Sequence, residues 1–127
     1  MAVSPPSAIY GGDTVADHQL PEELIELIAE RFRAIGEPIR LRILEQLRNE
    51  PKTVQQLVGA LGTTQQNVSK HLGVLRGLGI VSRRKDGLYA YYAIQDESLL
   101  RVCDEVCGSL KAQIAELNHL IGEDLPA

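Results

Sequence analysis

Two short amphipathic segments joined at a glycine constrain the fold of this chain more than any other feature. The first segment opens on Thr53 and Gln56 and the second on Thr63 and Gln66, so each begins with the Thr-x-x-Gln pattern of a helix capping box. Gly62 lies between them, where it ends the first helix. Two short helices joined by a tight, glycine-containing turn predict a helix-turn-helix.

The segments on either side complete the predicted order of elements. We expect helices from about Pro21 to Ile35, Glu37-Pro38 to about Arg48, Thr53 to Leu61, about Thr64 to Leu78, and about Asp96 to Ile121. Two strand-forming runs, Ile80 to Lys85 and Leu88 to Ile94, flank Asp86-Gly87, which is the strongest short hairpin signal. The predicted fold class is mostly α with a small β-hairpin (α+β).

The length of 127 residues suits one domain with a modest core. We divide the chain into a mobile arm at 1–17, rich in Ser, Pro and Gly, a folded domain at 18–122 and a tail at 123–127. No apolar run is long enough to span a bilayer, and residues 1–10 lack the pattern of a signal peptide. We therefore expect a cytoplasmic protein whose two cysteines are reduced thiols.

The net charge of -4 hides an uneven distribution of charge. The segment from Lys52 to Lys85 contains six basic residues and no Asp or Glu. The rest of the chain contains all 17 acidic residues and the other seven of the 13 basic residues. A basic island inside an acidic chain is typical of a site for a polyanion. A chance gap among the acidic residues is the alternative, but this gap coincides with the helix-turn-helix.

The second helix of the motif has a polar face without acidic residues. Val68, Leu72 and Leu75 repeat at helical spacing and are expected to face the core. The remaining polar side chains are of the kinds that read base edges in the major groove of DNA. These expected DNA-binding residues are Gln65, Gln66, Asn67, Ser69, Lys70 and, at the edge of the buried stripe, His71. The alternatives are that the set only solvates a surface and that His71 packs in the core.

The predicted hairpin carries Arg83, Arg84 and Lys85 directly before its turn. A basic hairpin that follows a recognition helix is the wing of a winged helix-turn-helix, and its cations would meet phosphates or the minor groove. The alternative is an exposed edge strand protected from aggregation by its charges. We expect the tyrosines of the second strand to support the wing rather than to stack on bases.

The last predicted helix has a long apolar stripe whose members recur in steps of three and four residues. They are Leu99, Cys103, Val106, Leu110, Ile114, Leu117 and Ile121. One small core cannot cover such a face, and a two-fold related copy would bury it. The stripe therefore predicts a homodimer.

Three runs of the sequence together resemble the ArsR/SmtB family of repressors. They are FRAIGEPIRLRIL at 32–44, NVSKHLGVLR at 67–76 and DGLYAYY at 86–92, and the likeness in order and spacing covers about residues 31–110. The resemblance implies a homodimer joined through its first and last helices. It also implies a repressor that binds double-stranded operator DNA and releases it when an inducer binds.

The sensing sites that the resemblance implies are not matched by this chain. Residues 54–57 hold no cysteine where one family site has a pair. Asp96 can match the acid of a second family site, but Ser98, Ser109 and Ala112 fall where its other ligands would be. A metal or metalloid inducer is therefore not supported by the usual ligand positions, and the cofactor stays unknown.

Cys103 and Cys107 are the candidate sensing thiols, because they lie one helical turn apart on the expected dimer helix. Thiolates bind soft metal ions and metalloids and take part in redox chemistry. The alternative is that Cys103 only packs, as a small apolar residue. A site that pairs His18 with a partner copy's His119 is a further option.

Two other classes of function compete with a DNA-binding repressor. A winged-helix interaction or dimerisation module without an operator would share the fold, but the basic island favours DNA. An enzyme is disfavoured because the chain has no phosphate-binding glycine loop, serine elbow or metalloprotease motif.

Overall fold

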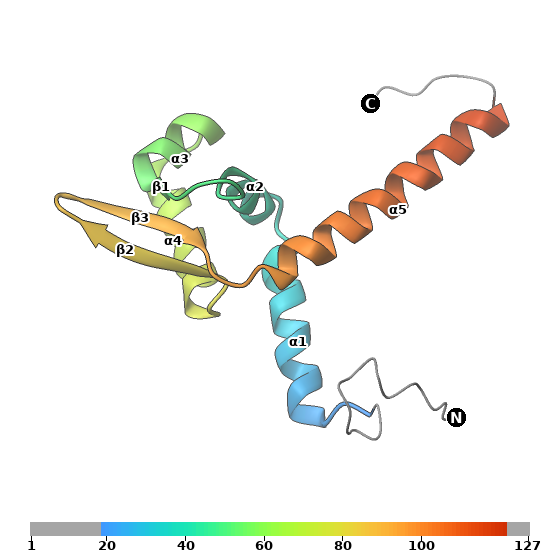
Figure 1. Ribbon diagram of the computed structural model, residues 1–127, viewed down its shortest axis with the longest axis horizontal. Helices are drawn as coiled ribbons and strands as arrows, with labels where there is room; N and C mark the ends of the chain where they lie inside the picture. Colours follow the sequence, from blue (N-terminus) through green and yellow to red (C-terminus); the bar gives the residue numbers. More distant parts are fainter. Residues whose placement is uncertain (1–18, 122–127) are drawn as a thin grey trace. The chain divides into compact units, whose positions relative to one another are not determined.

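The computed structural model describes residues 19–121, shown as coloured ribbon in Figure 1. The expected arm at 1–17, the tail at 123–127 and His18 lie outside the described residues. The chain divides between Glu37 and Pro38 into two compact units. The expectation of one folded domain over 18–122 stays a prediction.

The first unit contains one helix, α1 (Glu22–Ile35). Acidic residues occupy its first turn and Arg33 its last, so the charges complement the helix dipole. Its last two residues, Ala34 and Ile35, are buried, whereas Leu24 and Phe32 remain exposed in the single chain.

The second unit builds its core from three short helices and one strand. They are α2 (Pro38–Gln46), α3 (Val54–Leu61), α4 (Gln65–Gly77) and β2 (Val81–Asp86), and they pack against one another. The largest fully buried side chains are Ile43, Leu44, Leu57, Val68, Leu72, Leu75, Ile80 and Val81. Truncating one of these to Ala would cost about 2–5 kcal/mol, because the cavity collapses only partly.

The helix-turn-helix is confirmed, with one correction to its second cap. Thr53 forms the expected capping box: its Oγ1 accepts a hydrogen bond from the Gln56 N–H, and Gln56 Oε1 accepts one from the Thr53 N–H. The predicted box on Thr63 is wrong, because Thr64 caps α4 and accepts from the Asn67 N–H at 3.1 Å.

The turn explains this shift of one residue. Gly62 adopts a φ of 68°, which ends α3, and Thr63 stays inside the turn. Thr63 Oγ1 instead accepts a 3.0 Å hydrogen bond from the Asn67 side-chain amide. Two adjacent threonines both suit a cap, and only the path of the turn decides between them.

A three-stranded antiparallel sheet follows the helices, in the order β1-β3-β2. Strand β3 (Tyr89–Ile94) pairs with β2 as expected, and the structure adds β1 (Lys52–Thr53), which is too short to show a sequence period. The hairpin loop is Gly87-Leu88 rather than Asp86-Gly87, because Asp86 pairs with Tyr89. Gly87 has a φ of 66°, and glycine at the first loop position is what a type II′ turn requires.

The last helix, α5 (Ser98–Ile121), lines a groove with α2 along its first half, as far as Cys107. Leu99 is buried and Cys103 is half-buried. The five members of the apolar stripe beyond Cys103 are 45–52% exposed. No helix within residues 19–121 is long and apolar enough to cross a membrane.

Candidate nucleic-acid interface

Helix α4 separates its side chains into a buried face and an exposed polar face. Val68, Leu72 and Leu75 lie in the core, as their spacing predicted. The exposed side chains in the first turns are Gln65, Gln66, Ser69 and Lys70, and no acidic residue is among them. The helix therefore presents hydrogen-bonding groups and one cation together on one solvent-facing surface.

Two residues expected on this surface have other places in the structure. Asn67 is half-buried, and its side-chain amide donates to Thr63 at the start of α4. His71 is only 7% exposed, and its Nδ1 accepts a 3.0 Å hydrogen bond from Arg40 Nε on α2. Position 71 falls within the buried stripe, at helical spacing from Val68 and Leu75, and this burial argues against the expected DNA contact of His71.

Gly73 lies in the middle of the exposed face of α4. A Cβ atom built at this glycine would have no heavy atom within 4 Å, and its φ lies outside the range that favours glycine. Glycine inside a helix costs about 1 kcal/mol relative to alanine. Neither the packing nor the backbone conformation of the single chain therefore requires glycine at position 73.

The three wing cations are all exposed but lie on two faces of the hairpin. Arg83 and Lys85 share the face that begins with the buried Val81, because side chains alternate along a strand. Arg84 lies on the opposite face together with Asp86. The face of Arg83 and Lys85 therefore has the higher local positive charge.

Two features of the wing were not predicted from the sequence. Thr53, Gln55 and Gln56 form a shallow hollow of about 340 Å³ with Tyr89 and Tyr91. These residues come from distant segments that β1–β3 pairing brings together. The second feature is the loop residue after Gly87, a leucine that is 92% exposed at the tip of the hairpin.

The two candidate thiols line a groove of about 350 Å³ between α2 and α5. Both are free, with Cys103 half-buried and Cys107 exposed. Burial raises the pKa of the Cys103 thiol, and the neighbouring Asp104 carboxylate raises it further. The protonated form is a poor nucleophile, so this environment does not activate Cys103. Within residues 19–121, no cluster of three or more His, Cys, Asp or Glu residues is placed to hold a metal ion.

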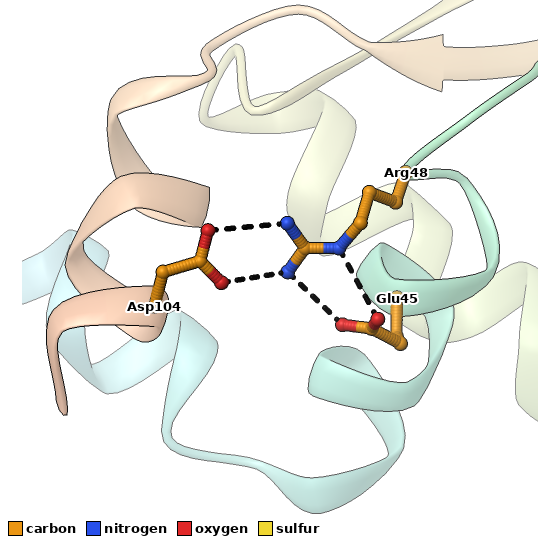
Figure 2. A network of polar contacts seen from close by, with 3 residues as sticks. All are labelled: Glu45, Arg48 and Asp104. Carbon is orange, nitrogen blue, oxygen red and sulfur yellow. Dashed lines mark hydrogen bonds and ion pairs between the residues drawn. The ribbon is translucent and has the colours of Figure 1, made fainter. Parts of the chain in front are cut away.

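Three charged side chains that line this groove form a network that joins α5 to α2 (Figure 2). Arg48, two residues past the end of α2, donates from Nη2 and Nη1 to the two carboxylate oxygens of Asp104 at 3.0 and 3.2 Å. It also donates from Nε and Nη2 to Glu45, both at 3.1 Å. These hydrogen bonds to Glu45 and Asp104 raise the pKa of Arg48. Because Arg48 and Asp104 are 56 residues apart, no local pattern could have predicted their contact.

Comparison with known proteins supports a single family for this arrangement. The sequence profile described as "Bacterial regulatory protein, arsR family" matches residues 37–83. The uncharacterized HTH-type transcriptional regulator Rv0081 of Mycobacterium tuberculosis is 40% identical over 104 residues, covering 78% of this chain and 91% of that protein. The HTH-type transcriptional repressor SmtB of the same species is 34% identical over 82 residues, 65% of this chain, and the match spans 61% of the length of SmtB.

Solved structures agree with these sequence matches. The crystal structure of Rv0081 superposes with a TM-score of 0.65 at 35% identity, covering 73% of this chain and 97% of that one. The homodimeric winged helix-turn-helix DNA-binding domain of Mb0332 from Mycobacterium bovis, described as a possible ArsR-family regulator, superposes with a TM-score of 0.62 at 25% identity, covering 87% and 99% of the two chains. The fold is a winged helix-turn-helix, and the chain belongs to the ArsR family of bacterial regulatory proteins.

Proposed function

We propose that this protein is a transcriptional repressor that binds operator DNA sequence-specifically as a homodimer. The observation that carries the proposal is the exposed, acid-free polar face of α4, followed in the chain by the basic β2–β3 wing. The names of the relatives support it, since SmtB is a transcriptional repressor and the Mb0332 domain is a homodimeric DNA-binding domain. Such a protein acts on DNA in the cytoplasm and has a regulatory rather than an enzymatic role.

In this proposal α4 enters the major groove and the wing follows the adjacent backbone. Gln66 and Ser69 are exposed near the start of the helix, where amides and hydroxyls reach base edges. Lys70 reaches a guanine or a phosphate. Gly73 allows the backbone of α4 to approach the DNA, and this explains a glycine that the fold does not require. The wing cations bind phosphates or the minor groove.

The apolar faces of α1 and α5 account for the proposed dimer. Each helix exposes large aliphatic side chains in the single chain, and on α5 these form one continuous stripe. A two-fold partner would bury them and would place two α4 helices to meet successive major grooves, about 34–36 Å apart.

The signal that releases the DNA is proposed from the thiols alone. The residues present do not fit the metal sites that the family resemblance implies, so no step is assigned to a metal. Cys107 is exposed beside the α2–α5 groove and is the thiol that a reagent would reach first. A Cys103→Ser, Cys107→Ser double variant should bind DNA like the unmodified protein and lose any release by As(III), soft metal ions or peroxide. Release that persists in the double variant would place the inducer site elsewhere.

A binding selection tests the proposed function directly. DNA recovered from a random pool by the full-length protein should converge on one motif, and its affinity should fall steeply with salt. Lys70→Ala should weaken operator binding, whereas Lys111→Ala, which removes the same charge from an exposed position on α5, should change it little. A pool that does not converge would favour the alternative, an interaction module without an operator.

A further inference from the structure

The contact of α5 with the rest of the second unit is narrow. Along its 24 residues only Leu99 is buried, and from Asp104 to Leu117 every side chain is exposed. Asp104 bridges to Arg48 with both carboxylate oxygens, inside the groove that Cys103 and Cys107 also line. The tilt of α5 relative to α2–α4 therefore depends on few contacts, namely those of Leu99, of the half-buried Leu100 and Cys103, and this ion pair.

The ion pair is suited to set an angle rather than to add stability. The side chains of Arg48 and Asp104 are 30% and 59% exposed, and ion pairs at such exposure contribute little free energy. Two parallel N–H···O bonds nevertheless hold the carboxylate in the plane of the guanidinium. Glu45 fixes that plane from the other side through two more hydrogen bonds, so the guanidinium has a defined orientation (Figure 2).

We propose that Arg48 and Asp104 are positioning residues for operator binding, which set the spacing of the two α4 helices through the tilt of α5. This inference rests on the proposed homodimer and its binding of DNA. Beyond Asp104 the helix continues for 17 residues, about 26 Å, so a tilt of about 10° moves its far end by about 4–5 Å. Two-fold symmetry applies the change in both protomers, and the half-sites of an operator tolerate little change in spacing.

The test compares isosteric variants by their preference for half-site spacing. Asp104→Asn removes the carboxylate charge but keeps the shape of the side chain. Affinity is measured by fluorescence anisotropy on the selected operator and on versions whose half-sites lie one or two base pairs closer or farther apart. We expect the unmodified protein to show a sharp optimum. Asp104→Asn should lose about five- to ten-fold in affinity at that optimum and bind the other spacings with nearly equal strength.

For Asp104→Asn, the change in charge alone predicts a gain in DNA affinity, whereas the positioning role predicts a loss. Asp104→Asn makes the protein less acidic and should therefore favour DNA slightly. Glu105→Gln changes the net charge equally on the next residue of α5, which takes part in none of the ion pairs found within residues 19–121, and should keep the sharp optimum. Arg48→Gln should flatten the spacing profile as Asp104→Asn does, whereas Arg42→Gln, at an exposed position on α2, should not.

Three results would overturn the inference. The first is an unchanged spacing profile in both Asp104→Asn and Arg48→Gln. The second is an equal loss of affinity at every spacing, which is the result of general destabilisation. The third is dissociation of the Asp104→Asn dimer, which would place Asp104 in the interface itself. If the unmodified protein fails to bind any DNA, the proposed function fails, whereas a sharp optimum in all variants removes the positioning role alone.

Discussion

Replacing Gly73 by alanine should change stability and DNA binding in opposite directions. The built Cβ meets no heavy atom within 4 Å, and residue 73 lies inside α4, so alanine enters without a clash. The gain in helix propensity is about 1 kcal/mol, which corresponds to a rise in Tm of about 3–4 °C for a domain of this size. In the proposed complex the same methyl group meets the DNA, and overpacking of about 1.4 kcal/mol would weaken operator binding about ten-fold.

The assay needs both measurements on one preparation. Thermal unfolding is followed at fixed protein concentration, since the apparent stability of a dimer depends on concentration, and operator affinity is measured by fluorescence anisotropy. Gly108→Ala is the matched control, because Gly108 is also a helical glycine with open space around its built Cβ, but lies on α5. It should raise Tm without changing affinity. Unchanged operator affinity in Gly73→Ala would refute close approach of α4 to DNA at this residue.

Three further predictions address the dimer, the wing and the thiol. Ile114 is 45% exposed in the single chain and lies in the middle of the stripe, so Ile114→Glu should weaken the dimer by about 3 kcal/mol, roughly 100-fold, in sedimentation velocity. Ala112→Glu, on the opposite side of α5, should leave the dimer intact. If Ile114→Glu also stays dimeric, the stripe is not the interface. Arg83→Ala should lower the slope of log affinity against log salt by about 1, and Arg84→Ala by less, because Asp86 shares the face of Arg84; the reverse order would place the other face of the wing on DNA. Because the folded chain raises the pKa of Cys103, iodoacetamide should alkylate this thiol more slowly at pH 7 than it does in urea, and alkylation should accelerate as the pH rises. Peptide mass spectrometry follows the reaction, and equal rates in the folded and unfolded chain at pH 7 would contradict the assigned burial.

The local sequence was enough to predict every helix and the hairpin. Each of those predictions depends on residues within four positions of one another: the Thr53 capping box, the glycine that ends α3, the apolar spacing of α4 and α5, and a hairpin turn that contains Gly87. Hydrogen bonds and side-chain periods of this range are properties of the chain itself, so they can be recognised before any packing is known. The family resemblance, which rests on such local runs, is confirmed by the relatives.

Tertiary packing decided the features that join distant residues. It placed Thr64 rather than Thr63 as the cap of α4. It also paired β1 with β3, drew His71 into a hydrogen bond with Arg40 across 31 residues, and joined Arg48 to Asp104 across 56. None of these contacts has a sequence period, because each depends on where two separate elements come to lie in the folded unit. The amphipathic pattern of α4 and α5 was thus a property of the sequence, whereas the orientation in which α5 leaves the domain follows from side-chain contacts that only the folded chain brings together.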